Sequence, residues 1–196
     1  TLAPYLLSRI IDPLSQSLPE LSFLLHEFQT DGLTKRLDRG QLDLLILPWK
    51  PEMECFDRID LFNEPLQLAA PRNHPILKKK QLTLDSLEGE HVLTLEDGHC
   101  LRDDVLDVCF SAGANEDHRF QATSLETLRF MVASGLGITL IPELAVDNNK
   151  NLSYRKFSMP EPQRMVSMVM RKGYSRVLCA QVISKIIKSS VNDLVH

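Results

Sequence analysis

The chain has 196 residues, of which 43% are hydrophobic and 24% charged, as is usual for one large or two small globular domains. It has no apolar run of the roughly 18 residues that a membrane span needs, and no secretory signal opens it, which argues against membrane proteins and exported proteins. The net charge of −4, from 22 basic and 26 acidic residues, argues against a nucleic-acid-binding surface, because such surfaces carry a basic excess.

Apolar strands and amphipathic helices alternate from the start of the chain. The first residue is not methionine, and it lies within what reads as a structured element, so we expect either a fragment of a longer protein or a processed start. The apolar runs 21–28 and 42–47 are typical of buried parallel strands. Between them, Leu33 and Leu37 share one helical face, and Gly40 can end that helix.

The second half of the chain continues the same alternation. Residues 92–95 are expected to form a strand that ends in a glycine turn. Thr123 and Glu126 fit a capping box at the start of a helix that Gly135 ends. Further along, we expect strands at 138–141 and 165–170 and a closing helix at 177–187.

This order of strand, helix and strand predicts an α/β fold with a mostly parallel sheet. The proline-containing stretches 64–75 and 159–162 are interpreted as two crossings between subdomains. We therefore expect one subdomain to contain residues 1–66 plus 168–196, and the other to contain residues 67–167. Because ligands of open α/β sheets bind beyond the carboxyl ends of the strands, the cleft between the subdomains is the expected site.

Cys100 falls where a helix should begin, directly after a strand and a glycine turn. A thiol at a helix N-terminus faces unpaired backbone N–H groups and the positive end of the helix dipole, and both favour the reactive thiolate. His99 and Arg102 add positive charge nearby, whereas Asp97 and Asp103 act in the opposite sense if they face the sulfur. The balance between these charges does not follow from the sequence.

Cys109 follows Cys100 by nine positions, which is about 13–14 Å along a continuous helix. A disulfide needs Cα atoms within roughly 4.4–6.8 Å, so the two cysteines can bond only if the intervening helix unwinds. The pair fits a redox switch, but it is also compatible with two unrelated core residues. Cys55 and Cys179 are assigned to packing, and we expect no cofactor and no metal site, because no cysteine or histidine has zinc-ligand spacing.

Two motifs carry a resemblance to a known family. The sequence EDGHCLRD at 96–103 with Cys109, and ATSLETLR at 122–129, closely resemble the OxyR family of hydrogen peroxide sensors within the LysR-type regulators. Segments 1–7 and 26–30 also look like that family's regulatory domain. The sequence GLGITLIP at 135–142 is similar to LysR-type effector domains in general.

The resemblance implies two Rossmann-like subdomains in a periplasmic-binding-protein-like effector domain. Cys100 would be the peroxidatic cysteine, oxidised first to sulfenic acid, and Cys109 the resolving cysteine that closes a disulfide. Local unwinding of the helix and a rearranged dimer would follow. The resemblance also implies five peroxide-binding residues, namely Thr1, Thr30, His99, Arg102 and Asp103.

The implied partners are hydrogen peroxide, a second copy in a homodimer (a homotetramer at full length) and a cellular thiol reductant. DNA would be bound only through an N-terminal helix-turn-helix that this chain lacks, and the whole protein would be a cytoplasmic activator of the oxidative stress response. It would not be an enzyme, because the disulfide is the signal and must persist until it is reduced. Two alternatives stay open: a LysR-type domain that binds a small organic acid with incidental cysteines, and a thiol peroxidase.

Overall fold

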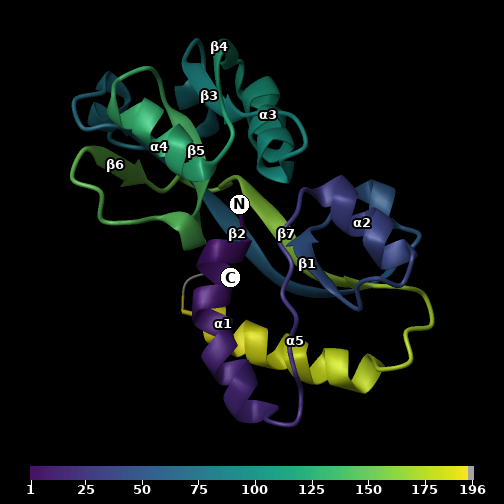
Figure 1. Ribbon diagram of the computed structural model, residues 1–196. Coiled ribbons are helices and arrows are strands. Elements are labelled where there is room, and N and C mark those ends of the chain that lie inside the picture. The colour runs from purple at the N-terminus through teal and green to yellow at the C-terminus, as the bar shows by residue number, and fades with distance from the viewer. Residues whose placement is uncertain (194–196) are drawn as a thin grey trace. The chain divides into compact units, whose positions relative to one another are not determined.

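The computed structural model describes residues 1–193, and the chain divides into two compact units. One unit, here the terminal unit, contains residues 2–64 and the chain from Arg164 onward. The other, here the central unit, contains residues 65–163 together with Thr1. Strand β2 (Asp57–Pro71) continues from one unit into the other, and β7 (Gln163–Met170) begins where the chain returns (Figure 1).

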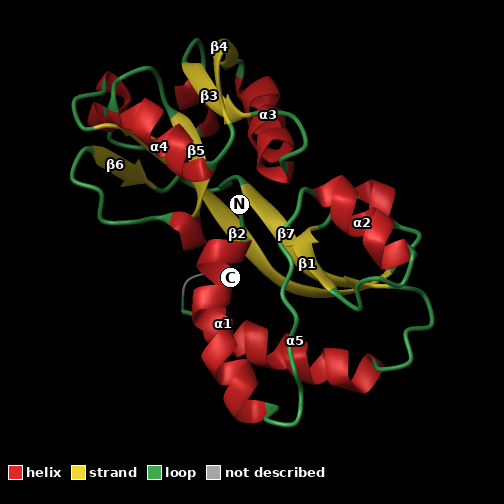
Figure 2. Cartoon of the chain, in the orientation of Figure 1, coloured by secondary structure: helices red, strands yellow, loops and turns green. Residues whose placement is uncertain are grey.

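The terminal unit combines a small sheet with helices (Figure 2). Strand β1 (Leu45–Pro48) pairs antiparallel with β7, and β7 lies beside β2 in the sheet. The helices are α1 (Ala3–Ser17), α2 (Thr30–Asp38), the short 3-10 helix η1 (Pro51–Met53) and α5 (Val177–Val191).

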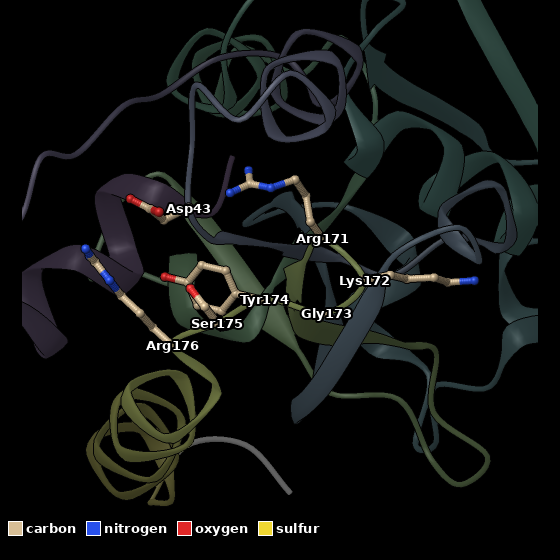
Figure 3. A pocket seen from close by; sticks show the side chains of 7 residues that line it. All are labelled: Asp43, Arg171, Lys172, Gly173, Tyr174, Ser175 and Arg176. Carbon is tan, nitrogen blue, oxygen red and sulfur yellow. The ribbon is translucent and has the colours of Figure 1, made fainter.

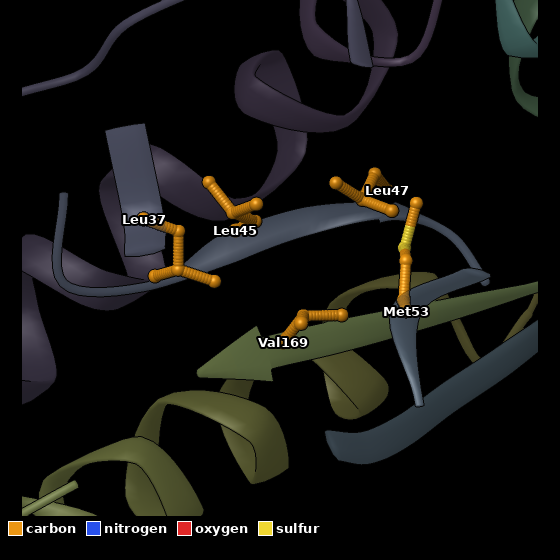
Figure 4. Close-up of a cluster of buried hydrophobic side chains, with 5 residues drawn as sticks. All are labelled: Leu37, Leu45, Leu47, Met53 and Val169. Carbon is orange, nitrogen blue, oxygen red and sulfur yellow. The ribbon is translucent and has the colours of Figure 1, made fainter. Parts of the chain in front are cut away.

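Apolar contacts between helices and strands stabilise the terminal unit. Helix α1 buries Leu6, Ile10 and Leu14, which recur every four residues and therefore line one face, and α1 packs against α5. A second cluster joins α2, β1, η1 and β7 through Leu37, Leu45, Leu47, Met53 and Val169 (Figure 4).

A buried ion pair lies where the chain passes between the units. The Arg164 guanidinium donates to one oxygen of the Glu64 carboxylate from Nε at 2.9 Å and from Nη2 at 2.7 Å. Glu64 is fully buried and Arg164 is 4% exposed. Removal of either partner would leave an uncompensated buried charge, so loss of this pair between β7 and β2 would be strongly destabilising.

The central unit contains two groups of strands. The second half of β2 pairs antiparallel with β5 (Thr139–Pro142) and with β6 (Leu152–Arg155). Strand β3 (His91–Leu95) pairs parallel with β4 (Asn115–Ala122). The helices are α3 (Cys100–Ala112), α4 (Leu125–Ala133) and the 3-10 helices η2 (Pro75–Lys78), η3 (Leu84–Leu87) and η4 (Glu143–Ala145).

Helix α3 is the element that positions the predicted cysteines. It buries Leu101, Val105, Cys109 and Ala112 on one face, and it packs against β3, β4 and η3. The helix ends at Gly113, whose φ of 67° lies in the left-handed region that favours glycine. Both ends of α3 are therefore defined by local sequence.

The expected α/β fold is confirmed, but a mostly parallel sheet is wrong. The strand pairings of β1 with β7 and of β2 with β5 and β6 are antiparallel. Parallel pairing is found for β3 with β4 and at the bridge between Val92 and Ile138.

Two local predictions are also corrected. Residues 21–28 form no strand; residues 21–26 line an apolar groove instead, and Leu24 is 85% exposed. An apolar run indicates contact with other apolar surface but does not identify a strand partner. The cap of α4 is Ser124, whose hydroxyl accepts from the Thr127 N–H at 3.1 Å, and not Thr123.

Candidate redox site

Cys100 is the first residue of α3, as the sequence predicted. Strand β3 ends at Leu95, and the following turn includes Gly98 with a φ of 90°, a conformation that favours glycine. His99 precedes the helix in extended conformation, and its side chain does not cap the helix. The Cys100 thiol is partly exposed and free, so it meets the positive end of the α3 dipole with access from outside the helix.

Cys109 has the opposite environment. It is 2% exposed, lies on the buried face of α3 with Leu101 and Val105, and carries a free thiol. Burial, followed by the negative charge of the Glu116 carboxylate, raises the pKa of the Cys109 thiol from 9.0 to about 11. Cys109 is therefore held as a protonated thiol, and the continuous helix separates it from Cys100 by about 13–14 Å of axial rise.

Arg102 connects the first turn of α3 to the sheet. Its guanidinium lies 3.2 Å from the Asp97 carboxylate through Nη1 and donates to Oε1 of Glu116 from Nη2 at 3.0 Å. The same Glu116 oxygen accepts from the buried Thr94 hydroxyl at 2.7 Å. Arg102 is therefore ion-paired with two carboxylates, which weakens the effect of its positive charge on the Cys100 sulfur.

Glu116 was missed by sequence reasoning. Its side chain is 9% exposed, and its second oxygen lies 3.4 Å from Nδ1 of His118. Strand β4 reads Asn-Glu-Asp-His and has no apolar alternation that would reveal it as a strand. The register of β4 against β3, which brings Glu116 beneath α3, is a tertiary property that the local sequence does not carry.

The peroxide-binding residues expected from the family resemblance are divided among several places. His99, Arg102 and Asp103 lie at the start of α3, next to Cys100. Thr1 groups with the central unit, whereas Thr30 is the first residue of α2 in the terminal unit. Their shared role at one peroxide site stays a prediction.

The remaining cysteines differ from expectation in one case. Cys55 is exposed, so its assignment to packing is wrong; it lies in the short turn between η1 and β2, where little chain covers it. Cys179 is partly exposed in α5 and lines an apolar groove of about 860 Å³ together with residues of α1 and of segment 21–26.

A polar pocket of about 320 Å³ lies in the terminal unit (Figure 3). Asp43 and residues 171–176 line it, and Arg171 within it donates to the Leu37 and Leu42 carbonyls at 2.7 and 2.6 Å. Burial, followed by the Asp43 carboxylate, raises the pKa of Tyr174. None of the predicted site residues lines this pocket.

Within residues 1–193, no cluster of three or more histidine, cysteine, aspartate or glutamate side chains is arranged to hold a metal ion. In the same range, no helix has both the length and the apolar character that a bilayer crossing requires.

The chain is similar to a protein family and to curated proteins that agree with one another in name. The LysR substrate binding domain family matches residues 1–190. The hydrogen peroxide-inducible genes activator of Dickeya chrysanthemi is 47% identical over 176 residues, which are 88% of this chain and 58% of that protein. The DNA-binding transcriptional dual regulator OxyR of Escherichia coli K12 is 48% identical with the same coverage. The chain thus spans less than two thirds of these curated relatives.

Solved structures point the same way. The oxidised form of OxyR superimposes with a TM-score of 0.88 at 44% identity, covering 98% of this chain and 92% of that one. The reduced form of OxyR gives the same TM-score and coverage at 40% identity. The curated relatives are regulators of transcription by name.

Proposed function

Because the chain belongs to the LysR substrate binding domain family, with OxyR regulatory domains among its structural relatives, we propose that it senses hydrogen peroxide for a LysR-type transcription regulator. The observation that carries this proposal is the placement of two free cysteines on one helix, Cys100 at its N-terminus and Cys109 on its buried face. One thiol is accessible to a small oxidant, and the other is withheld until the helix changes.

In the first step, the Cys100 thiolate attacks one oxygen of hydrogen peroxide. A sulfur–oxygen bond forms, the oxygen–oxygen bond breaks, and hydroxide leaves and takes up a proton to become water. The sulfur is oxidised to sulfenic acid and the peroxide is reduced. The N-terminus of α3 favours this step, because its dipole stabilises the negative charge on the attacking sulfur.

In the second step, Cys109 attacks the Cys100 sulfenic acid. A sulfur–sulfur bond forms, the sulfur–oxygen bond breaks, and the Cys109 proton leaves with the hydroxyl as water. The helical separation of about 13–14 Å exceeds the disulfide limit of roughly 7 Å, so α3 must unwind between the two residues. The chemical change is thereby converted into a change of shape.

Binding of the peroxide itself would require further polar side chains. We assign this role to the residues that match the family pattern, namely Thr1, Thr30, His99, Arg102 and Asp103. For Arg102, the two ion pairs favour a role in holding the first turn of α3 over direct activation of the sulfur.

The wider partners follow from the same proposal. The whole protein would act as a homodimer or homotetramer in the cytoplasm, bind DNA through a separate N-terminal helix-turn-helix, and be reset by a thiol reductant. The reaction would occur once per reduction cycle, because a persistent disulfide is what makes the signal. A thiol peroxidase would instead consume peroxide continuously when it is supplied with reductant.

Trapping of the first intermediate tests the proposal. In a Cys109→Ser variant, a sulfenic-acid-specific probe such as dimedone should label Cys100 after exposure to micromolar peroxide, and Cys55 much less. Equal labelling of Cys55 and Cys100 would contradict a specific peroxidatic site, because Cys55 is an exposed thiol outside any helix terminus. A shift of melting temperature with small organic acids, without any labelling, would favour the effector-binding alternative.

A further inference from the structure

The proposed switch requires α3 to unwind, but the apolar packing of its buried face opposes this. One residue that couples the start of α3 to the sheet is Glu116, on strand β4, through its ion pair with Arg102. Its carboxylate accepts from Arg102 at 3.0 Å and from Thr94 at 2.7 Å, and only 9% of the side chain is exposed. No motif of the sequence analysis included this residue.

We propose that Glu116 is a positioning residue of the switch: its carboxylate fastens the first turn of α3 through Arg102, so that Cys109 reaches Cys100 only after this ion pair opens. The inference rests on the proposed peroxide-sensing function and deepens it. It assigns to one side chain on β4 control over the second step, the closure of the disulfide.

The geometry around Arg102 supports this assignment. The Arg102 side chain is 15% exposed, and its Nε is buried without a hydrogen-bond partner in the described part of the chain. Its second ion pair is with Asp97, which is 89% exposed, so water competes strongly for that contact. Glu116 is therefore the partner, shielded from water, that offsets the desolvation cost of the largely buried Arg102 guanidinium.

Glu116 also faces the other end of the switch. Its negative charge is close enough to Cys109 to act, after burial, as the second cause of the raised pKa of that thiol. While α3 stays folded, the Glu116 carboxylate thus opposes both release of the first turn of α3 and formation of the Cys109 thiolate. When α3 unwinds, both of these effects are lost, so disulfide closure follows helix opening.

The test compares the two chemical steps in variants of this chain. Glu116→Gln keeps the shape and the acceptor for Thr94 but removes the charge that holds Arg102. We expect the rate of disulfide closure after a peroxide pulse to rise about fivefold, the usual scale for replacing a charge-assisted hydrogen bond by a neutral one. The rate of Cys100 sulfenylation, measured with dimedone in a Cys109→Ser background, should be unchanged.

Asp117→Asn is the matched control. Asp117 is the next residue of β4, has a side chain that is only 3% exposed, and pairs with Arg119 at 2.7 Å instead of with α3. It should leave the closure rate unchanged even if it destabilises the unit. Asp97→Asn, on the exposed partner of Arg102, should change closure less than twofold and serves as a second test if Glu116→Gln folds poorly.

Three results would overturn the inference. An unchanged or slower closure rate in folded Glu116→Gln would remove the fastening role. An equal acceleration of disulfide closure in Asp117→Asn would show that general loss of stability causes the effect. A larger acceleration in Asp97→Asn than in Glu116→Gln would show that the exposed Asp97 carboxylate, and not Glu116, holds Arg102. If the wild-type chain forms no disulfide between Cys100 and Cys109, the proposed function fails as well, so the two failures are distinguishable.

Discussion

Gly113 offers a direct way to change the stability of α3 without touching either cysteine. It ends the helix with a φ of 67°, and its N–H donates to the Cys109 carbonyl. A Cβ built on this residue would lie 3.7 Å from Cγ of Glu88, which is an ordinary contact and causes no clash. The cost of Gly113→Ala is therefore conformational, about 1 kcal/mol for a non-glycine residue in the left-handed region.

A loss of this size should be visible in the rate of disulfide closure. If closure requires α3 to open first, about 1 kcal/mol raises the open population, and hence the closure rate, roughly fivefold. Stopped reactions after a peroxide pulse, quenched with an alkylating agent and analysed by peptide mass mapping, give this rate. Sulfenylation of Cys100 should be unchanged, because Gly113 lies at the opposite end of the helix.

Gly135→Ala is the matched control. Gly135 follows α4 with a φ of 82°, and an added Cβ would meet no atom within 4 Å. The substitution should cost a similar conformational free energy in the same unit, so urea unfolding should place both variants at similar stability. Equal closure rates in the two variants would refute the link between unwinding of α3 and disulfide formation.

Three further outcomes follow from the structure. Arg119, mainly through its side-chain hydrogen bond, lowers the pKa of Asp117 from 3.8 to about 2. The Asp117 carboxylate should therefore contribute to the free energy of unfolding above about pH 4, and this contribution should be lost as the pH falls toward 2. In urea unfolding, Asp117→Asn should lack this pH-dependent contribution. The Cys109 pKa of about 11 leaves this thiol protonated near neutral pH, so timed alkylation of the reduced chain at pH 8 should modify exposed Cys55 long before Cys109, and comparable rates would contradict its burial. Leu37→Ala should lower the free energy of unfolding by about 2–5 kcal/mol, because Leu37 is fully buried in the cluster with β1 and β7, and a loss below 1 kcal/mol in urea titration would show that the cluster is loose.

Local sequence was sufficient for the elements that carry the chemistry. The glycine turn before Cys100, the helical spacing of Leu101 and Val105, and Gly113 at the helix end are all short-range signals, and they placed α3 correctly. The strand before it was also located, since 92–95 is a compact apolar run between turns. These features depend on residues within one or two turns of one another.

The features that the sequence did not reveal depend on distant partners. The apolar run 21–28 has the composition of a strand, but it lies against the groove beside α1 and α5 without pairing in a sheet. Strand β4 is polar, and its pairing with β3 is what brings Glu116 beneath α3. The buried pair of Glu64 and Arg164 likewise joins residues 100 positions apart. In each case, contacts with residues distant in the sequence determine the local structure.

The most direct test of the central proposal is a peroxide titration of the reduced chain, followed by alkylation and peptide mass mapping. We expect a disulfide between Cys100 and Cys109 at micromolar peroxide, absent in Cys100→Ser, with faster hydrogen exchange across α3 in the oxidised form. If all four thiols can still be alkylated after the peroxide-treated chain is unfolded, the peroxide-sensing proposal is contradicted, and a domain that binds a small organic acid becomes the better explanation.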